Sequence, residues 1–417
     1  MADVGEVLDT LELAAGRRLA VLREADGMAA LPMILDPAGR WRRARPGDGV
    51  AEALLSTLAT RSELDGTTPD GTTPDDTTAA GNFRLHSWTR HTAAGERAMD
   101  VDQTNESVIV GDAAVVKWAT HLQRGPHPAP HRIAVLRDVG FEGMPTPWGI
   151  VTWQPPDGAE TVVASVDEYL PGAVDGWTWA VDLYTAAAAD RAPAQVLQPV
   201  AEVGALVADM HAALSRTVGL ASQHDADRWR ADALLTLETV CGLADSASAE
   251  FVRVHRRELE AILDGLGGLA GAPIIAGHGD LHVGQVLRSD GRFVITDFDG
   301  NPVLPAQQRI LAIPAAVDVA GLTQSLAHVA IVAAKHTELD AAALADVDAA
   351  GRAAFLSSYT ARLHELGHAD LYDATQLGAL RIQQVLREVI YADRHLRRWM
   401  YVPDAALPAL FAEEPTT

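Results

Sequence analysis

The most informative stretch of the chain is His278-Gly279-Asp280-Leu281-His282-Val283-Gly284-Gln285, followed twelve residues after Gln285 by Asp297-Phe298-Asp299-Gly300. Between them, residues 289–291 (Ser-Asp-Gly) have the composition of a turn, and residues 293–296 form a short apolar, β-branched run. We therefore expect a tight hairpin that brings Asp297 back beside Gln285 and Asp280. A lone His-Gly-Asp is weak evidence for a functional site. The loop, the turn, the strand and the second acidic segment together are strong evidence for one.

These residue types suit phosphoryl transfer, which needs a base for the acceptor hydroxyl, ligands for Mg²⁺ and a cation on the nucleotide phosphates. Asp280 precedes Gln285 by five residues, the D-x-x-x-x-N spacing of a kinase catalytic loop with Gln in place of Asn. We predict that Asp280 is the catalytic base. Gln285 and Asp297 are the predicted Mg²⁺ ligands, because side-chain oxygens are what this hard cation prefers. The alternative is a surface hairpin with incidental acids.

The composition predicts a soluble protein of two lobes plus an appendage, since 417 residues, 48% of them hydrophobic, can bury a large core. The net charge of −23 argues against nucleic acid or an anionic membrane as a partner. The single Cys241 cannot form an intrachain disulfide, and no signal peptide is apparent. The most apolar run, residues 318–335, carries four polar residues. We expect a cytoplasmic monomer or weak dimer.

Residues 1–85 are predicted to form an N-terminal cap subdomain. Apolar spacing favours a helix over residues 4–15, two strands within 31–41 and a helix over 50–58. The insert near residues 61–81 is rich in Thr, Pro, Asp and Gly, and its repeated D-G-T-T-P has no apolar side chain. We expect this insert to be a flexible loop, since it has nothing to bury.

Residues 86–171 have the pattern of a strand-rich, nucleotide-binding lobe. A hairpin over residues 107–118 places Lys117 at the end of its second strand, and a helix over 130–139 and strands over 148–153 and 162–170 follow.

Residues 172–417 are predicted to form a mostly helical lobe that holds the catalytic loop and the acceptor site. Its helices are expected over residues 177–189, 196–215, 225–243, 248–266, 318–335, 340–366 and 374–400.

Taken together, these features resemble the aminoglycoside-phosphotransferase-like kinases, and within them the bacterial maltokinases and actinobacterial glucosamine kinases. The segments that carry the resemblance are residues 105–110, 116–117, 168–173, 175–177, 210–211, 277–287, 297–300 and 318–321. The resemblance covers the chain except the insert. It implies an α+β, two-lobed protein-kinase-like fold with an N-terminal cap subdomain and a mostly helical C-lobe, and ATP and Mg²⁺ as cofactors.

The resemblance also implies a nucleotide site. Lys117 would hold the α- and β-phosphates, and Asn105 and Ser107 would cover the phosphates at the tip of the first hairpin. Main-chain groups of Glu168 and Leu170 would meet the adenine at the hinge between the lobes. The acid that normally pairs with such a lysine is left unassigned, because the helix over 131–139 contains no Glu.

The acceptor site is expected after the metal-binding Asp. Asp299 and Asn301 lie where maltokinase-like sequences have Glu-Gly-Glu, which argues against maltose as the acceptor. Asp299 needs a cationic or hydroxylic partner, either from the substrate or from Arg309. His282 either orients Asp280 or fills the core beneath the loop.

A second set of acceptor candidates lies near the C-terminus. Glu388, His395 and Trp399 are spaced by seven and four residues, so we expect them to share one helix face. Trp399 could then stack on a sugar while the other two bind hydroxyls; the alternative is core packing.

Three functions are compatible with these residues. The first is a sugar kinase that phosphorylates glucosamine at O6. The second keeps the chemistry but takes maltose, giving the 1-phosphate, or an aminoglycoside. The third is a catalytically dead nucleotide-binding regulator, which the intact Asp280, Gln285, Asp297 and Lys117 disfavour. We expect ATP and an amino sugar as ligands.

Overall fold

The structure is a computed structural model, and it describes residues 5–25, 27–62, 77–99, 106–244 and 246–413. The chain forms two compact units. The first, here called the strand-rich unit, contains Met1–Ile133, Met144–Gly172 and Pro305–Ile310. The second, the helical unit, contains Ala134–Gly143, Ala173–Leu304 and Leu311–Thr417.

The strand-rich unit contains two antiparallel sheets. The first has the order β1-β2-β3-β4 and the second the order β5-β6-β10-β11-β9-β8-β7. The first sheet consists of β1 (Glu6–Ala14), β2 (Arg17–Glu24), β3 (Gly27–Leu35) and β4 (Trp41–Arg43). The second consists of β5 (Thr77–Ala80), β6 (Phe83–Ser87), β7 (Glu96–Ala98), β8 (Glu106–Val110), β9 (Ala114–Trp118), β10 (Pro147–Trp153) and β11 (Thr161–Glu168). Helix α1 (Val50–Ser62) and the short helix α8 (Ala306–Arg309) belong to this unit as well, and the division between the units falls within α2 (Ala129–Asp138).

The predicted helix over residues 4–15 is wrong, because this segment is strand β1. Its apolar residues fit a helical spacing, but a turn at Gly16, with φ of 70°, folds β2 back onto β1. Pairing with β2 satisfies the backbone groups along one edge of β1, and Leu11 is buried in the shared core. Tertiary pairing thus overrides a weak local preference.

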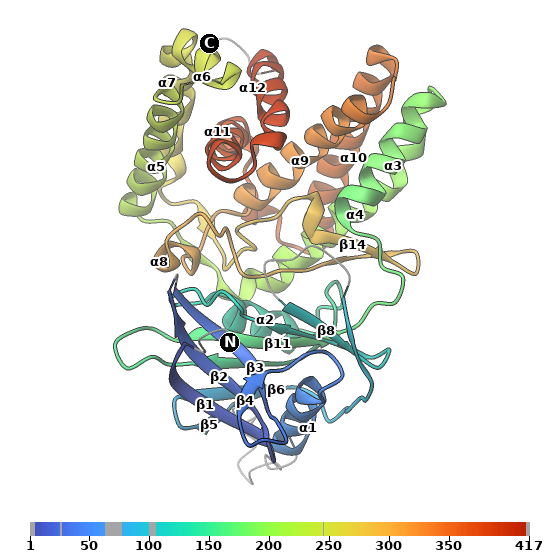
Figure 1. Cartoon of the computed structure of the whole chain (residues 1–417). Helices are drawn as coiled ribbons and strands as arrows, with labels where there is room; N and C mark the ends of the chain where they lie inside the picture. Colours follow the sequence, from blue (N-terminus) through green and yellow to red (C-terminus); the bar gives the residue numbers. More distant parts are fainter. Residues whose placement is uncertain (1–4, 26, 63–76, 100–105, 245, 414–417) are drawn as a thin grey trace. The chain divides into compact units, whose positions relative to one another are not determined.

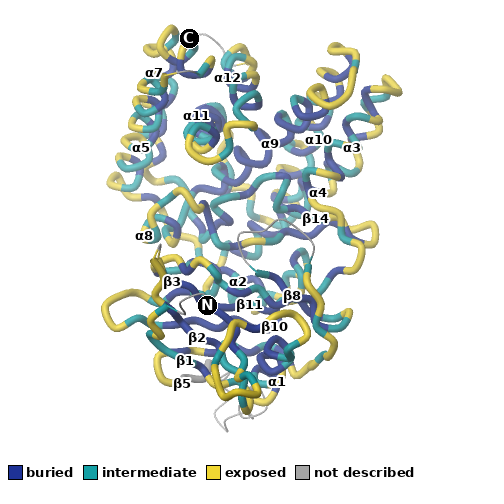
Figure 2. The backbone as a smooth tube through the Cα atoms, in the orientation of Figure 1, coloured by how far each residue is buried: buried dark blue, intermediate teal, exposed yellow. Residues whose placement is uncertain are grey.

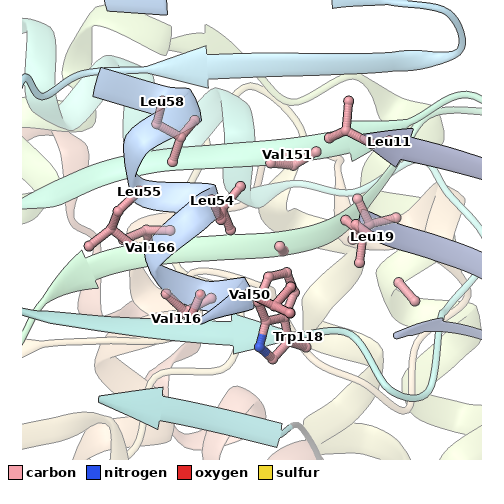
Figure 3. Packing of buried hydrophobic residues seen from close by; sticks show 14 of the residues in the cluster. Leu11, Leu19, Val50, Leu54, Leu55, Leu58, Val116, Trp118, Val151 and Val166 are labelled. Atoms are coloured by element: carbon pink, nitrogen blue, oxygen red, sulfur yellow. The ribbon is translucent and has the colours of Figure 1, made fainter. Parts of the chain in front are cut away.

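The core of the strand-rich unit lies between α1 and the two sheets (Figure 3). Leu54 and Leu58 of α1 pack in one cluster with Val116 and Trp118 of β9, and Leu19 of the first sheet joins them. Full burial of each such leucine stabilises the fold by roughly 1.5–3 kcal/mol. Because side chains alternate along a strand, β9 presents Lys117 on the face opposite Val116 and Trp118.

The helical unit is built from long helices and one short hairpin (Figure 1). The helices are α3 (Gly176–Ala189), α4 (Leu197–Leu214), α5 (Gln223–Cys241), α6 (Ala247–Val254), α7 (Arg256–Asp264), α9 (Ala315–His336), α10 (Ala341–Glu365), α11 (Leu377–His395) and α12 (Tyr401–Glu413). The hairpin consists of β14 (Val286–Ser289) and β15 (Arg292–Ile295), and β12 (Gly219–Leu220) pairs with β13 (Pro273–Ile274). The single helix expected over 248–266 is instead two, α6 and α7, separated at His255.

Helix α9 is the central helix of this unit and packs against α3, α10, α11 and α12. Figure 2 shows it buried along most of its length. Among the described residues it is the one helix long and apolar enough to cross a membrane, yet 83% of its most apolar window is buried inside the protein. It is a core helix that also carries the buried polar residues Asp318, Gln324 and His328.

Candidate active site

The predicted catalytic loop, residues 277–285, is held by a buried carboxylate of α9. Asp318 is 1% exposed, and its two oxygens accept hydrogen bonds from the backbone N–H groups of His278 and Gly279, both at 2.7 Å. Burial alone would raise the pKa of Asp318, but His211, 3.2 Å away, and the loop amides hold it below its ordinary value. His211 in turn lies 2.8 Å from the hydroxyl of Tyr359 on α10. The loop therefore rests on a buried, ionised anchor.

Two glycines allow helices to approach this loop closely. A Cβ on Gly321 of α9 would collide with the carbonyl oxygen of Leu281, and one on Gly176 at the start of α3 would collide with that of Val283. Ser325 of α9 accepts a 2.9 Å hydrogen bond from the N–H of Val283. The segments 175–177 and 318–321, noted above as parts of the resemblance, are thus the places where helices touch the loop.

The predicted hairpin is confirmed. Its turn residues Asp290 and Gly291 both have positive φ, 50° and 78°, as expected of the tight turns that favour hairpins. The returning strand brings Asp297 back beside Gln285, with Nε2 of Gln285 3.2 Å from Oδ2 of Asp297. Thr296 donates its N–H to the carbonyl oxygen of Gln285 at 2.9 Å. The two predicted metal ligands are therefore side-chain neighbours.

Asp297 itself has a strained backbone, with φ of 66°. A non-glycine residue in this region costs on the order of 1 kcal/mol or more, and such strain gathers at functional sites. The neighbouring residues fix it in place. Phe298 is buried against the ring of His278, 5.2 Å between centroids, and Nε2 of His278 lies 3.0 Å from the carbonyl oxygen of Thr296.

Asp280 lies in an environment that disfavours its charge. Burial and the charges of Asp297 and Asp318 raise its pKa to about 7, and only Arg387 of α11 opposes them. A carboxyl group with a pKa near neutrality is suited to taking a proton. The sequence analysis did not identify Arg387, although it lies next to the predicted Glu388.

His282 contacts its own loop. Its Nδ1 accepts the N–H of Gly284 at 3.0 Å, and its Nε2 lies 3.4 Å from Nε2 of Gln285. Burial lowers its pKa to about 4, so the ring is neutral at physiological pH. The ring centroid of Trp177, on the first turn of α3, is 6.4 Å away. These contacts favour neither of the two roles predicted for His282.

The predicted helix face shared by Glu388, His395 and Trp399 is wrong for Trp399, while Glu388 and His395 both lie on α11. Helix α11 ends at His395, and Leu396 leaves the helical conformation with φ of −145°, so helical spacing does not extend to Trp399. His395 is exposed and lies beside Tyr391.

Trp399 nevertheless approaches the loop by another route. Its ring packs edge-on against Trp177 at 5.2 Å, and Trp177 in turn lies beside His282. Trp177 belongs to a segment that carries the resemblance but was not predicted as a site residue. Its position at the start of a predicted helix could have indicated this role.

Glu388 is partly buried. Its side chain is 23% exposed, and its Oε1 accepts a 3.0 Å hydrogen bond from Gln384. Nδ1 of His328, on α9, is 3.3 Å from Oε2, which has no hydrogen bond of good geometry among the described residues. Burial raises the pKa of Glu388 to about 8. The charge of Asp280 raises this pKa further, and the hydrogen bond from Gln384 opposes the shift.

Three further acceptor candidates follow Asp297 in sequence. Asp299 is partly buried. Asn301 is 8% exposed and its Oδ1 accepts the N–H of Val303 at 3.1 Å, so it supports a turn. Arg309 ends the short helix α8 (Ala306–Arg309), which belongs to the strand-rich unit, and its carbonyl oxygen accepts a hydrogen bond from Arg132.

In the strand-rich unit, Lys117 lies in a polar row across the large sheet. It is directly opposite Ser107 of β8 and Ser165 of β11, so the three side chains share one face. Its Nζ is 3.9 Å from Oδ2 of Asp167 on β11. Asp167 is therefore a candidate for the acid that the sequence left unassigned, on a neighbouring strand rather than on the following helix. Asn105 lies outside the described residues.

The predicted hinge residues follow β11. Glu168 donates its N–H to the carbonyl oxygen of Thr146 at 2.8 Å, while its carboxylate accepts from the N–H and hydroxyl of the same residue. Leu170 is 9% exposed. Glu168 therefore has its N–H committed within the protein.

Candidate metal donors are few in the part of the chain that the structure describes. No group of three or more His, Cys, Asp or Glu side chains is placed to hold a metal there. The adjacent carboxylate and amide of Asp297 and Gln285 are oxygen donors, which suits Mg²⁺ better than a softer metal.

Comparison with known proteins gives full-length matches. The chain is 60% identical over 411 residues to a curated glucosamine kinase of Mycolicibacterium smegmatis, covering 98% of this chain and 99% of that one. It is 43% identical over 414 residues to the glucosamine kinase of Streptacidiphilus jiangxiensis, covering 97% and 90%. A solved glucosamine kinase in complex with glucosamine, ADP and inorganic phosphate matches with a TM-score of 0.83 at 39% identity, covering 98% and 95%. No protein-family model matches the chain.

Proposed function

The chain belongs to the family of glucosamine kinases, and we propose that it transfers the γ-phosphate of ATP to O6 of D-glucosamine. The observation that carries this proposal is its full-length similarity to proteins of that name, one of them solved with glucosamine, ADP and inorganic phosphate. The loop and hairpin of the helical unit supply the chemistry such a reaction needs.

Asp280 is the base in this proposal. Its carboxylate accepts the proton of the acceptor hydroxyl as the oxygen attacks the γ-phosphorus. The anchoring of the loop by Asp318 supports this role, since a base must be held within hydrogen-bonding reach of the hydroxyl.

Gln285 and Asp297 would hold Mg²⁺, because they are neighbouring oxygen donors at the end of a rigid hairpin. When bound, the ion would neutralise charge on the nucleotide phosphates. Phe298, buried against His278, helps to hold the strained backbone of the adjacent Asp297 in place for that purpose.

The strand-rich unit would bind the nucleotide. Lys117, whose Nζ lies 3.9 Å from Oδ2 of Asp167, would supply the cation for the α- and β-phosphates. Ser107 lies directly across the sheet from Lys117, and with Asn105 it would cover the phosphates. The main chain near Glu168 and Leu170 would meet the adenine. Since the N–H of Glu168 is committed, its carbonyl and the groups of Leu170 are the ones proposed to serve.

The acceptor would lie in the helical unit. Glu388, whose pKa is raised by burial, would gain a cation beside its carboxyl group from the 2-ammonium of glucosamine, and the partly buried Asp299 is the second candidate for this contact. Trp399, positioned by Trp177, offers a ring for the sugar face. His282 lines the loop.

The other three predicted acceptor residues receive no acceptor contact in this proposal. Asn301 is assigned to turn support, His395 is exposed, and Arg309 is a buried residue of the strand-rich unit. We place the enzyme in the cytoplasm as a monomer or weak dimer, without a nucleic-acid or membrane partner.

The test is ADP release from ATP and Mg²⁺ with glucosamine, glucose, N-acetylglucosamine, maltose and kanamycin. We expect glucosamine to exceed glucose and N-acetylglucosamine by about ten- to a hundredfold in kcat/KM, the effect of losing one charge-assisted hydrogen bond. NMR of the product should place the phosphate on O6. A preference for maltose or kanamycin would assign one of the alternative acceptors, and no release with any acceptor would favour the regulator. The Asp280→Asn protein is the control for contaminating kinases.

A further inference from the structure

A chain of buried polar side chains leads from Arg381 on α11 toward Glu388, and its hydrogen bonds run in one direction. Arg381 is 7% exposed, and its Nε lies 3.1 Å from Oε1 of Gln324. A guanidinium can only donate, so the amide oxygen of Gln324 must face it. The amide nitrogen of Gln324 therefore points the other way, toward Nε2 of His328 at 3.1 Å.

That arrangement selects one tautomer of His328. Because the amide nitrogen of Gln324 donates, Nε2 of His328 must accept, and the proton of the neutral ring sits on Nδ1. His328 is 2% exposed, and burial with the nearby charge of Arg381 lowers its pKa to about 3, so it stays neutral. Nδ1 lies 3.3 Å from Oε2 of Glu388. The donor direction set at Arg381 thus points the Nδ1–H of His328 toward Oε2 of Glu388, without a hydrogen bond of good geometry between the two in this structure.

The far end of the chain is anchored at the C-terminal helix. Glu413, the last described residue of α12, lies 3.0 Å from Arg381 and 2.9 Å from Arg352. Arg352 also makes two bonds to Asp348, one turn earlier on α10. Arg381 is therefore held by α12 on one side while it donates to α9 on the other.

We propose that Arg381, Gln324 and His328 form a positioning relay that holds the carboxylate of Glu388 in place for the amino sugar. The inference rests on the proposed function, because it takes Glu388 as an acceptor-binding group. His328 is a positioning residue here and touches neither substrate nor nucleotide. Other groups facing Glu388 are Gln384 on its own helix and Asp280 of the catalytic loop. The relay aims the Nδ1–H of His328 at Oε2 of Glu388 from α9, at 3.3 Å.

The first test reads the tautomer directly. In the full-length protein labelled with ¹⁵N-histidine, the signal of His328 is identified by its loss in His328→Asn. We expect the Nδ1–H tautomer in the wild type and a loss of that single tautomer in Gln324→Met. An Nε2–H tautomer in the wild type overturns the relay. This measurement needs no substrate, so it decides the relay even if glucosamine turns out not to be phosphorylated, which would refute the proposed function instead.

The second test is kinetic. His328→Leu removes the donor and should raise KM for glucosamine by about tenfold or more while KM for ATP changes by less than about twofold. His328→Asn can place an amide N–H where Nδ1 was, so it should stay within about threefold of wild type. Gln324→Met should fall between them.

The matched control is Gln383→Met. It makes the same change at a buried glutamine of α11 that is not part of the relay. It should leave KM for glucosamine unchanged. An unchanged KM for glucosamine in His328→Leu overturns the proposal. So does a parallel loss of melting temperature and kcat in all the variants, control included, since that pattern means a structural role only.

Discussion

The two compact units hold their polar residues in different ways. In the strand-rich unit, Lys117 and Asp167 form a loose pair, 3.9 Å apart, with side chains 37% and 23% exposed. In the helical unit, Asp318 and His211 are fully buried, and His328 is 2% exposed. Each of these buried groups has a partner on another segment of the chain.

This difference follows from what each unit has to bind. The proposed nucleotide site relies on backbone groups and on Lys117. Exposure of these groups to water does not prevent them from binding the nucleotide. The proposed acceptor site must orient one hydroxyl and one ammonium, and an unpaired buried polar group there is costly. The buried networks therefore give the helical unit a preorganised site, and substitutions should have larger effects there than in the strand-rich unit.

The largest effect is expected at the catalytic loop. Asp280→Asn should lower kcat by about 10²–10⁴-fold, the usual worth of a positioned base, while leaving ATP binding and the fold intact. Steady-state kinetics and nucleotide titration measure the two quantities. Asp290→Asn is the matched control, because Asn also tolerates the positive φ of that turn position. A folded Asp280→Asn protein that keeps more than about a tenth of wild-type kcat would falsify the base assignment.

The next effect tests the anchor beneath the loop. Asp318→Asn leaves one loop amide and His211 without a carboxylate oxygen, so it should lower the free energy of unfolding by about 3 kcal/mol and slow turnover. Denaturant unfolding followed by fluorescence measures the first. Asp340→Asn serves as control, since Asn caps α10 as well as Asp does. Equal stability of both variants would show that the anchor is dispensable.

The candidate site residues differ in how far they could be predicted from the sequence. Asp280, Gln285 and Asp297 were predictable because a turn fixes their proximity within twenty residues. The lysine's partner was not, since Asp167 reaches Lys117 across a sheet whose strand order is not written in local spacing. The same holds for His328 and Gln324, whose partners lie some 60 residues away on another helix.

Two of the local errors have a related cause. Residues 4–15 and the segment ending at Trp399 both fit a helical period, and both were decided otherwise by contacts outside the segment: pairing with β2 in one case and packing on Trp177 in the other. Helical spacing places residues on one face only where the segment actually forms a helix.

A third prediction concerns the pH dependence of stability. The pKa of Glu388 is raised to about 8 in the folded protein from an ordinary value of 4.5, so the folded state holds a proton that the unfolded state has released between these values. The free energy of unfolding should therefore fall by about 1.4 kcal/mol per pH unit across that window, and Glu388→Gln should abolish this contribution.

The measurement is the difference in unfolding free energy between Glu388→Gln and wild type at pH 5, 6.5 and 8. The variant should gain relative to wild type as the pH rises. Glu365→Gln, at a side chain that is 64% exposed, should show no such trend. A difference that does not change with pH would mean that Glu388 is ionised throughout.

The smallest effects should come from the strand-rich unit, where a matched pair of substitutions separates the cation from its partner. Lys117→Met removes the charge proposed to meet the phosphates and should lower kcat/KM for ATP by about ten- to a hundredfold. Asp167→Asn keeps the lysine and removes only a partly exposed ion pair, which is worth less than about 1 kcal/mol, so KM for ATP should rise by no more than about fivefold. KM for glucosamine should be unchanged in both. If Asp167→Asn proved as damaging as Lys117→Met, the pair would be as tightly organised as the buried networks of the helical unit, and the contrast between the two units would disappear.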